Sequence, residues 1–336
     1  MNVFAAGTGV GSWPGSAPRE AAAVVVGELI QLPYLPELPA RGVGADMIGR
    51  AGALLVDIAI DTMPRGYRIV ARPGSVSRRA ASLLGEDVDA LEEAWEKAGG
   101  AQPGRSVKVQ APGPITLAAQ LELANGHRAI TDPGALRDLA ASLAEGMAVH
   151  RGALARRLDA PVVVQFDEPL LAAALAGRLT GVTALTPVHP VDETLAITLL
   201  DECAARVGGE VLLHTCAAEP PWEVLQRSAI SAVSVDLPAL AAESLDGLGE
   251  FVDSGRTAVL GLAPAIAPDQ RPSVEELTIA AAAVTDRLGF PRSVLGERIG
   301  VSPSCGLAGA SEEWARAVTV LTQRAASAIA DDPAAI

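Results

Sequence analysis

The sequence predicts an α/β protein of the (β/α)8 TIM-barrel class, on three grounds. Eight short apolar runs each end in glycine, proline or polar residues, as the buried strands of a parallel sheet do. Longer segments rich in alanine and leucine, with helical spacing, alternate with most of these runs. The length of 336 residues is sufficient for eight such units. We therefore expect residues 1–336 to form a single barrel domain, with an open doubly wound sheet as the alternative.

The expected strands follow one another along the whole chain. The second contains prolines, which disfavour a central strand. In order they are NVFAAGTGVGSW (2–13), QLPYLPELP (31–39), SVKVQAPGP (106–114), PVVVQFDEP (161–169), GEVLLHTC (209–216), SAVSVDLP (231–238), TAVLGLAP (257–264) and RIGVSPSCG (298–306).

Helices are expected between these runs where end signals frame an apolar pattern. Residues 77–99 finish on a glycine pair, and 132–158 begin with Asp-Pro, a cap followed by a proline suited to the first turn. The stretch 180–192 contains two prolines, and we expect it to be a loop over the active-site face.

Two later helices have the clearest start signals. Ser273 and Glu276 form the pattern of a capping box, and Gly289 is a stop signal for the same helix. The last helix begins at Ser311, with acidic residues in its first turn.

Composition restricts the possible functions. Hydrophobic residues make up 49% and aromatic residues 3% of the chain, so its core must consist mainly of Ala, Val, Leu and Ile. The net charge of −14, without a basic run, argues against nucleic acids and anionic membrane surfaces as partners. No apolar stretch is long enough to cross a bilayer, and the start does not resemble a secretory signal, so we expect a soluble, cytoplasmic protein.

His214 and Cys216 are the first candidates for chemistry. They lie two residues apart in an expected strand, so their side chains face the same side. Cys305 ends another expected strand, and in a barrel all strand ends meet on one face. An imidazole and two thiolates suit a catalytic zinc, although cysteines are also often simply buried. Cys203, in a helical segment, we interpret as a core residue.

Carboxylates at other strand ends are candidates for the same pocket. Asp236 and Glu219 are alternatives for a fourth zinc ligand. Asp167 and Glu168 are adjacent, so only one of them is expected to enter the pocket. Asp167 would suit an ammonium group there.

Seven of these segments, in one order, resemble the C-terminal catalytic barrel of cobalamin-independent methionine synthase. No counterpart of that family's N-terminal barrel is present, so the chain looks like a short, single-barrel form. The resemblance covers nearly the whole chain and is carried by GVGSWPG, VQAPGPIT, VVVQFDEPLL, LLHTC, VSVDL, VLGLAP and VSPSCGL.

The resemblance implies a zinc-dependent methyltransferase that activates the thiol of homocysteine, or of a related small thiol, and produces methionine. The residues that match the family's zinc ligands are His214, Cys216 and Cys305, with Asp236 at the position of a glutamate. The residues that match its amino-acid site are Val10, Gly11, Ser12 and Asp167, with Glu37 as the candidate for a second acid.

Two departures from the family concern the methyl donor. Ile266 stands where the family has a histidine proposed as an acid, and the segment after GPIT lacks the aromatic residues that pack a pterin. The donor is therefore either methyltetrahydrofolate or a methylated corrinoid protein. Two alternatives to the methyltransferase are a metal-free enzyme like uroporphyrinogen decarboxylase and a non-catalytic barrel that binds a thiol or amino acid.

Overall fold

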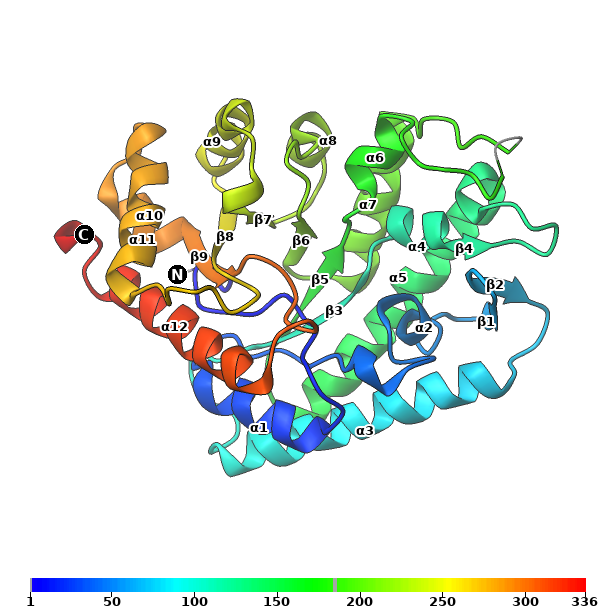
Figure 1. The fold of residues 1–336 in the computed structure, drawn as a ribbon, viewed down its shortest axis with the longest axis horizontal. Coiled ribbons are helices and arrows are strands. Elements are labelled where there is room, and N and C mark those ends of the chain that lie inside the picture. The colour runs from blue at the N-terminus through cyan, green and yellow to red at the C-terminus, as the bar shows by residue number, and fades with distance from the viewer. Residues whose placement is uncertain (1, 184–185) are drawn as a thin grey trace.

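The computed structural model describes residues 2–183 and 186–336, and six strands form its central parallel sheet (Figure 1). All six coincide with expected strands. In spatial order they are β3 (Val107–Pro112), β5 (Val162–Asp167), β6 (Val211–Thr215), β7 (Ala232–Asp236), β8 (Thr257–Ala263) and β9 (Ile299–Pro303).

The first two expected strands are not regular strands, and that part of the prediction is wrong. Residues 2–13 and 31–39 contain many glycines and prolines, which do not sustain a sheet ladder. Single bridges nevertheless join them into the ring: Gly7 pairs with Val301 of β9, Ser12 with Glu37, and Tyr34 with Lys108 of β3. The barrel therefore closes through two irregular segments, as the (β/α)8 prediction requires and the open-sheet alternative does not.

The expected helices are confirmed with shifted ends. The capping box of Ser273 and Glu276 is formed, and the side chains of Asp132 and Ser311 accept N–H groups at the starts of their helices. The helices are α3 (Ser75–Lys97), α5 (Pro133–Leu158), α10 (Val274–Arg287) and α12 (Glu312–Asp331), joined on the outside by α1 (Pro18–Glu28), α7 (Glu193–Val207), α8 (Trp222–Arg227), α9 (Leu245–Asp253) and α11 (Arg292–Arg298).

Several short elements near the carboxyl ends of the strands were not predicted from the sequence. A hairpin of β1 (Ala59–Met63) and β2 (Gly66–Val70) pairs with β4 (Leu121–Glu122). Part of the expected 180–192 loop, residues 184–185, lies outside the described residues. The short helices are α2 (Met47–Ala51), α4 (Pro114–Gln120) and α6 (Leu171–Leu175).

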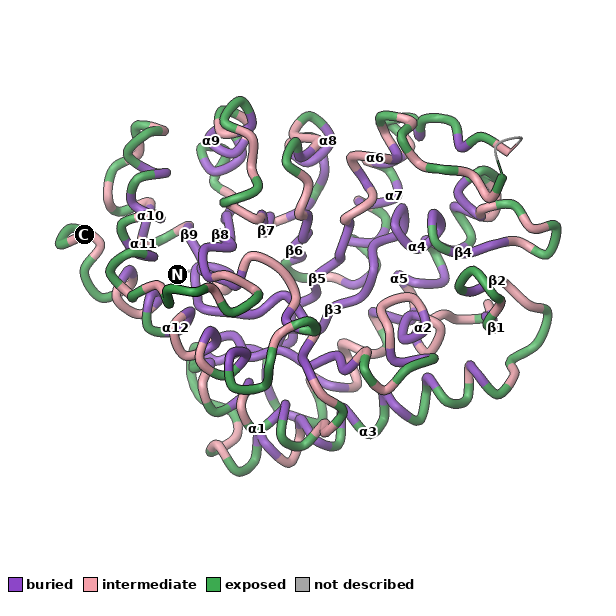
Figure 2. The backbone as a smooth tube through the Cα atoms, in the orientation of Figure 1, coloured by how far each residue is buried: buried purple, intermediate pink, exposed green. Residues whose placement is uncertain are grey.

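The barrel interior is apolar at the amino-terminal ends of the strands and polar at the carboxyl ends. The apolar cluster at the amino-terminal ends includes Val163, Leu212 and Ala232, one residue from each of the neighbouring strands β5, β6 and β7. Because side chains alternate along a strand, the residues two and four positions further on also face inward. The strands are buried along almost their whole length (Figure 2), so these positions converge inside the carboxyl end of the barrel.

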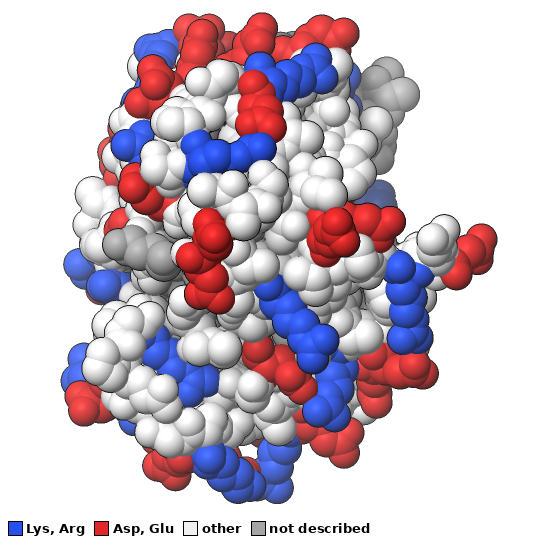
Figure 3. Space-filling model, turned by 90° about the vertical axis from the view of Figure 1, so that its left-hand side faces the viewer, with Lys and Arg blue, Asp and Glu red and all other residues white. Residues whose placement is uncertain are grey.

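The outer surface carries charges of both signs. On the face shown in Figure 3, acidic and basic side chains are interspersed among uncharged atoms. None of the described helices combines the length and the apolar character needed to cross a bilayer. Active sites of (β/α)8 barrels lie at the carboxyl ends of the strands, so the barrel interior at that end is the candidate pocket.

Candidate active site

His214, Cys216 and Cys305 meet at the carboxyl ends of the barrel strands. Their ligand atoms all lie within 4.8 Å of one another, with His214 buried and both cysteines half-buried. His214 and Cys216 come from the end of β6, while Cys305 follows β9, about ninety residues later in the chain. The shared face expected for His214 and Cys216 therefore leads into the same pocket as Cys305.

The neighbouring groups orient the imidazole and activate one thiol. Nδ1 of His214 lies 3.1 Å from Oγ of Ser234, its register partner on β7, which leaves Nε2 for the cysteines. Hydrogen bonding from Cys216 and then from His214 lowers the pKa of Cys305, whereas the same contact and burial raise the pKa of Cys216. The group thus stabilises a thiolate in a partly buried site.

Asp236 lies beside this group at the end of β7. Its Oδ1 is buried and has no hydrogen-bond partner among the described residues. Burial, together with the nearby Cys305, raises the pKa of its carboxyl group. Glu219, the alternative acid, is exposed on the loop after β6.

These donors fit a zinc ion. One imidazole nitrogen and two sulfurs are ligands that zinc prefers, and a buried carboxylate oxygen without a partner is suited to complete the set. His214, Cys216 and Cys305 would hold the ion, with Asp236 as the nearest candidate for a fourth ligand.

The irregular segment at Val10, Gly11 and Ser12 forms another wall of the barrel interior, where the Val10 carbonyl accepts hydrogen bonds from Lys108 and Gln165. The Gly11 carbonyl accepts the N–H of Glu37 at 3.0 Å, and the Ser12 carbonyl accepts the N–H of Leu307 at 2.9 Å. Nothing among residues 2–183 and 186–336 accepts the N–H groups of Gly11 and Ser12. Two N–H groups on a fixed backbone suit a carboxylate.

Asp167 and Glu37 bring two acids to this wall. Both are buried, and burial is the main cause that raises the pKa of each, to about 7 for Glu37. Arg50 of α2 lies 3.8 Å from Glu37 and is itself paired with buried Asp87 of α3. Asp167 stands in register beside His214, so the acids and the zinc-type ligands share one pocket.

Glu168 points away from the pocket and stabilises the backbone around it. Its carboxylate accepts the N–H groups of Ile115 and Thr116 and the hydroxyl of Thr116, at 2.7–2.9 Å. A side chain at Gly113 would collide with it, since an added Cβ would lie 2.3 Å from Oε1. Glu168 of the DEP sequence thus binds the backbone of the GPIT sequence. Of the two adjacent acids, only Asp167 enters the pocket, as expected from strand alternation.

Three polar residues of the pocket escaped the sequence prediction: Lys108, Gln110 and Gln165. They are buried beneath the acids, on β3 and β5. Lys108 and Gln110 lie two residues apart on β3, and Gln165 lies two residues before Asp167 on β5. A polar residue repeated every second position inside an apolar strand was the available signal, because such residues face a barrel interior.

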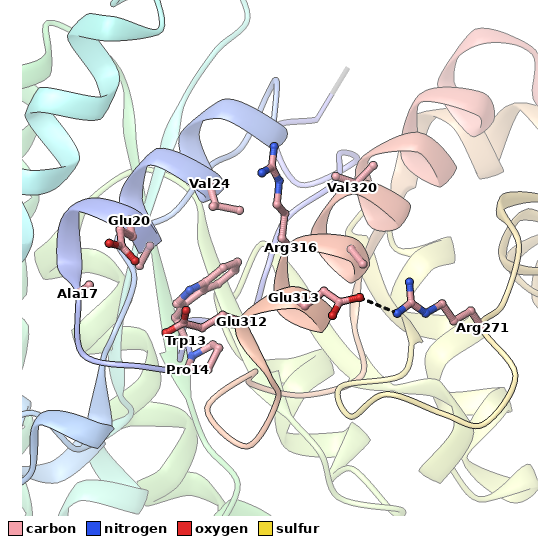
Figure 4. A pocket seen from close by; sticks show the side chains of 12 residues that line it. Trp13, Pro14, Ala17, Glu20, Val24, Arg271, Glu312, Glu313, Arg316 and Val320 are labelled. Carbon is pink, nitrogen blue, oxygen red and sulfur yellow. Dashed lines mark hydrogen bonds and ion pairs between the residues drawn. The ribbon is translucent and has the colours of Figure 1, made fainter.

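Two other surface features lie outside this pocket. A groove of about 630 Å³ runs between α1 and α12 and is bordered by the Arg271–Glu313 ion pair, 3.0 Å long (Figure 4). Trp13 lines it, but none of the predicted site residues does. Ile266, on the loop after β8, is 57% exposed, and its aliphatic side chain has no acidic proton to supply.

Comparisons with known proteins identify the family of the chain. The family model of the cobalamin-independent synthase catalytic domain matches residues 4–328. No curated protein sequence matches the chain significantly.

Three solved structures are similar to the chain at 14% identity, which shows the shared fold. One is a B12-independent methionine synthase from Shewanella sp. W3-18-1 in complex with selenomethionine (TM-score 0.61, covering 99% of this chain and 100% of that one). Another is a methyltransferase from Methanosarcina mazei (0.54, 97% and 94%), and a third is a putative vitamin-B12 independent methionine synthase from Listeria monocytogenes (0.54, 96% and 96%). Because the family model spans almost the entire sequence, this chain belongs to the catalytic-domain family of cobalamin-independent methionine synthases and is a methyltransferase.

Proposed function

We propose that the protein transfers a methyl group to the thiol of homocysteine and forms methionine at a zinc site. The observation that carries this proposal is the convergence of His214, Cys216 and Cys305 near two buried acids, of which Asp167 is the register partner of His214. The similar Shewanella structure is a complex with selenomethionine, which supports an amino acid of this shape as the ligand. The family assignment favours methyl transfer over the decarboxylase and the non-catalytic barrel.

The chain's own groups would bind the two ends of homocysteine. Asp167 and Glu37 accept the ammonium group, and the N–H groups of Gly11 and Ser12 suit its carboxylate. Zinc held by His214, Cys216 and Cys305 would lower the pKa of a substrate thiol and leave its sulfur nucleophilic. The thiolate then attacks the methyl carbon, so that a sulfur–carbon bond forms while the donor's bond to methyl breaks and its electron pair stays with the donor.

The donor that fits these residues best is a compound other than methyltetrahydrofolate. Release of a folate nitrogen needs a proton, and Ile266 cannot supply one. The α4 helix that follows the GPIT sequence offers only aliphatic and small polar side chains, so a pterin has nothing aromatic to stack on there. A methylated corrinoid is the first donor to test, in parallel with methyltetrahydrofolate.

The zinc content of the purified protein tests the proposal directly. We expect about one zinc per chain, and X-ray absorption should show an additional sulfur neighbour after homocysteine is added. Cys305→Ser should lose most of the zinc and the activity, whereas the control Cys203→Ser, altered in a buried core cysteine, should keep both. A metal-free protein, or equal zinc in wild type and Cys305→Ser, would contradict the mechanism.

A further inference from the structure

Two buried glutamines connect the acids of the pocket to the irregular segments that close the barrel. Nε2 of Gln165 donates to the Val10 carbonyl at 2.7 Å and to Oδ1 of Asp167 at 2.6 Å. Nε2 of Gln110 donates to the Leu35 carbonyl at 2.6 Å and, at 3.2 Å, to a side-chain oxygen of the second acid. Each side-chain amide therefore donates one hydrogen bond to a carboxylate and one to a backbone carbonyl.

The two glutamines make equivalent contacts because they occupy equivalent positions in the sheet. Gln110 and Gln165 are register partners on β3 and β5, so the same bridge is made twice at one level of the barrel. The carbonyls belong to the two segments that close the barrel without regular strand pairing. The glutamines thus fix the distance between each acid and a segment that sheet hydrogen bonds hold only at single points.

Lys108 completes this level of the barrel with a positive charge. Its side chain is 0% exposed, and Nζ donates to the Val10 carbonyl at 3.1 Å while lying 5.1 Å from the centre of the Tyr34 ring. It also attracts the charges of Asp167 and Glu37. Arg50 also lies near Glu37, which shares it with Asp87, whereas Lys108 interacts with both acids of the pocket, so Lys108 partly balances the pair.

We propose that Lys108, Gln110 and Gln165 are positioning residues that hold Asp167 and Glu37 in place for the substrate's α-ammonium group, and so make the pocket select amino thiols. The proposal rests on the function proposed above and adds the residues that determine its specificity. Two carboxylates fixed side by side offer acceptors for the hydrogens of a substrate ammonium, and that cation offsets the charge of both. A thiol without an amino group leaves these two buried acids without that partner.

The test compares homocysteine with 4-mercaptobutanoate, which has the same thiol and carboxylate but no amino group. We expect the wild type to prefer homocysteine, and Gln165→Met to lower that preference at least tenfold through a higher KM, with kcat changed less than threefold and zinc content unchanged. Gln110→Met acts on the other acid and should give the same pattern, which keeps the test decisive if one variant does not fold.

Gln323→Met is the matched control. Gln323 is also buried and also binds the backbone of an N-terminal residue, with Oε1 accepting the N–H of Ile30 at 3.0 Å, but it touches no acid. A purely structural role predicts that all three variants lose stability and none changes the preference, and that result would overturn the inference. A wild type that neither binds nor methylates homocysteine would instead refute the proposed function.

Discussion

Individual residues in this pocket owe their properties to burial more than to their immediate sequence neighbours. Glu37 is an ordinary acid in the sequence, yet removal from water raises its pKa to about 7, an effect that Arg50 offsets only in part. Asp167 and Lys108 also face it, and they act in opposite directions on its charge. The acid therefore titrates in the range in which enzymes are assayed.

Methionine binding should depend on the charge of Glu37. The carboxylate is ionised above its pKa and protonated below it, so affinity for the ammonium group should fall as the pH drops through about 7, by about fivefold from pH 7 to pH 6. Titration calorimetry with methionine, which has no thiol to titrate, measures this.

Glu37→Gln should bind methionine more weakly and with a flatter pH dependence. Glu312→Gln, altered at the groove between α1 and α12, should behave like the wild type. An unchanged pH dependence in Glu37→Gln would exclude Glu37 as the titrating group.

At the scale of elements, the link between β5 and α4 shows how the barrel fixes its upper rim. Glu168 follows directly after β5 and binds the first turn of α4, which begins directly after Gly113. The buried carboxylate has its charge spread over three donors, and this is the arrangement in which a buried acid is stable.

Thr116→Val tests this link. It removes the hydroxyl that donates to Glu168 at 2.7 Å and should lower the free energy of unfolding by about 1.5–3 kcal/mol, measured by urea denaturation. The control is Thr322→Val, since the buried Thr322 hydroxyl has no hydrogen-bond partner in the part of the chain that the structure describes. That change should be neutral or slightly stabilising, and equal losses in both variants would contradict the assigned role of Glu168.

At the scale of the whole molecule, the group of His214, Cys216 and Cys305 lies on a sheet whose strand pairing does not depend on a metal. His214, Cys216 and Cys305 come from the ends of β6 and β9, whose pairings with their neighbours do not involve these side chains. A core of aliphatic residues surrounds the barrel on both sides of the sheet. We propose that residues 1–336 unfold as one domain and that the fold does not depend on the metal.

Chelation should therefore shift the melting temperature only slightly. We expect one cooperative transition by calorimetry and circular dichroism, lowered by about 5 °C or less when zinc is removed. Cys305→Ser, which should hold little zinc, should show no further shift with the same chelator. Loss of helical ellipticity at room temperature on chelation would show that the metal is structural.

The sequence by itself determined the parts of this protein that local patterns encode. Strand alternation placed His214 and Cys216 on one face, and valine-rich runs located six strands, because burial on both faces requires apolar residues over short spans. Capping residues located the helices to within a few positions.

Only the tertiary structure decided how the irregular segments close the barrel and what fixes the two acids. Val10 is 98 positions from Lys108 and 155 from Gln165, and these contacts form only when the ring of strands is complete. Hydrogen bonds between residues so far apart in the chain produce no repeating pattern that could be recognised in the sequence. The ligand types could therefore be predicted from the chain alone, while the residues that position them depend on closure of the fold.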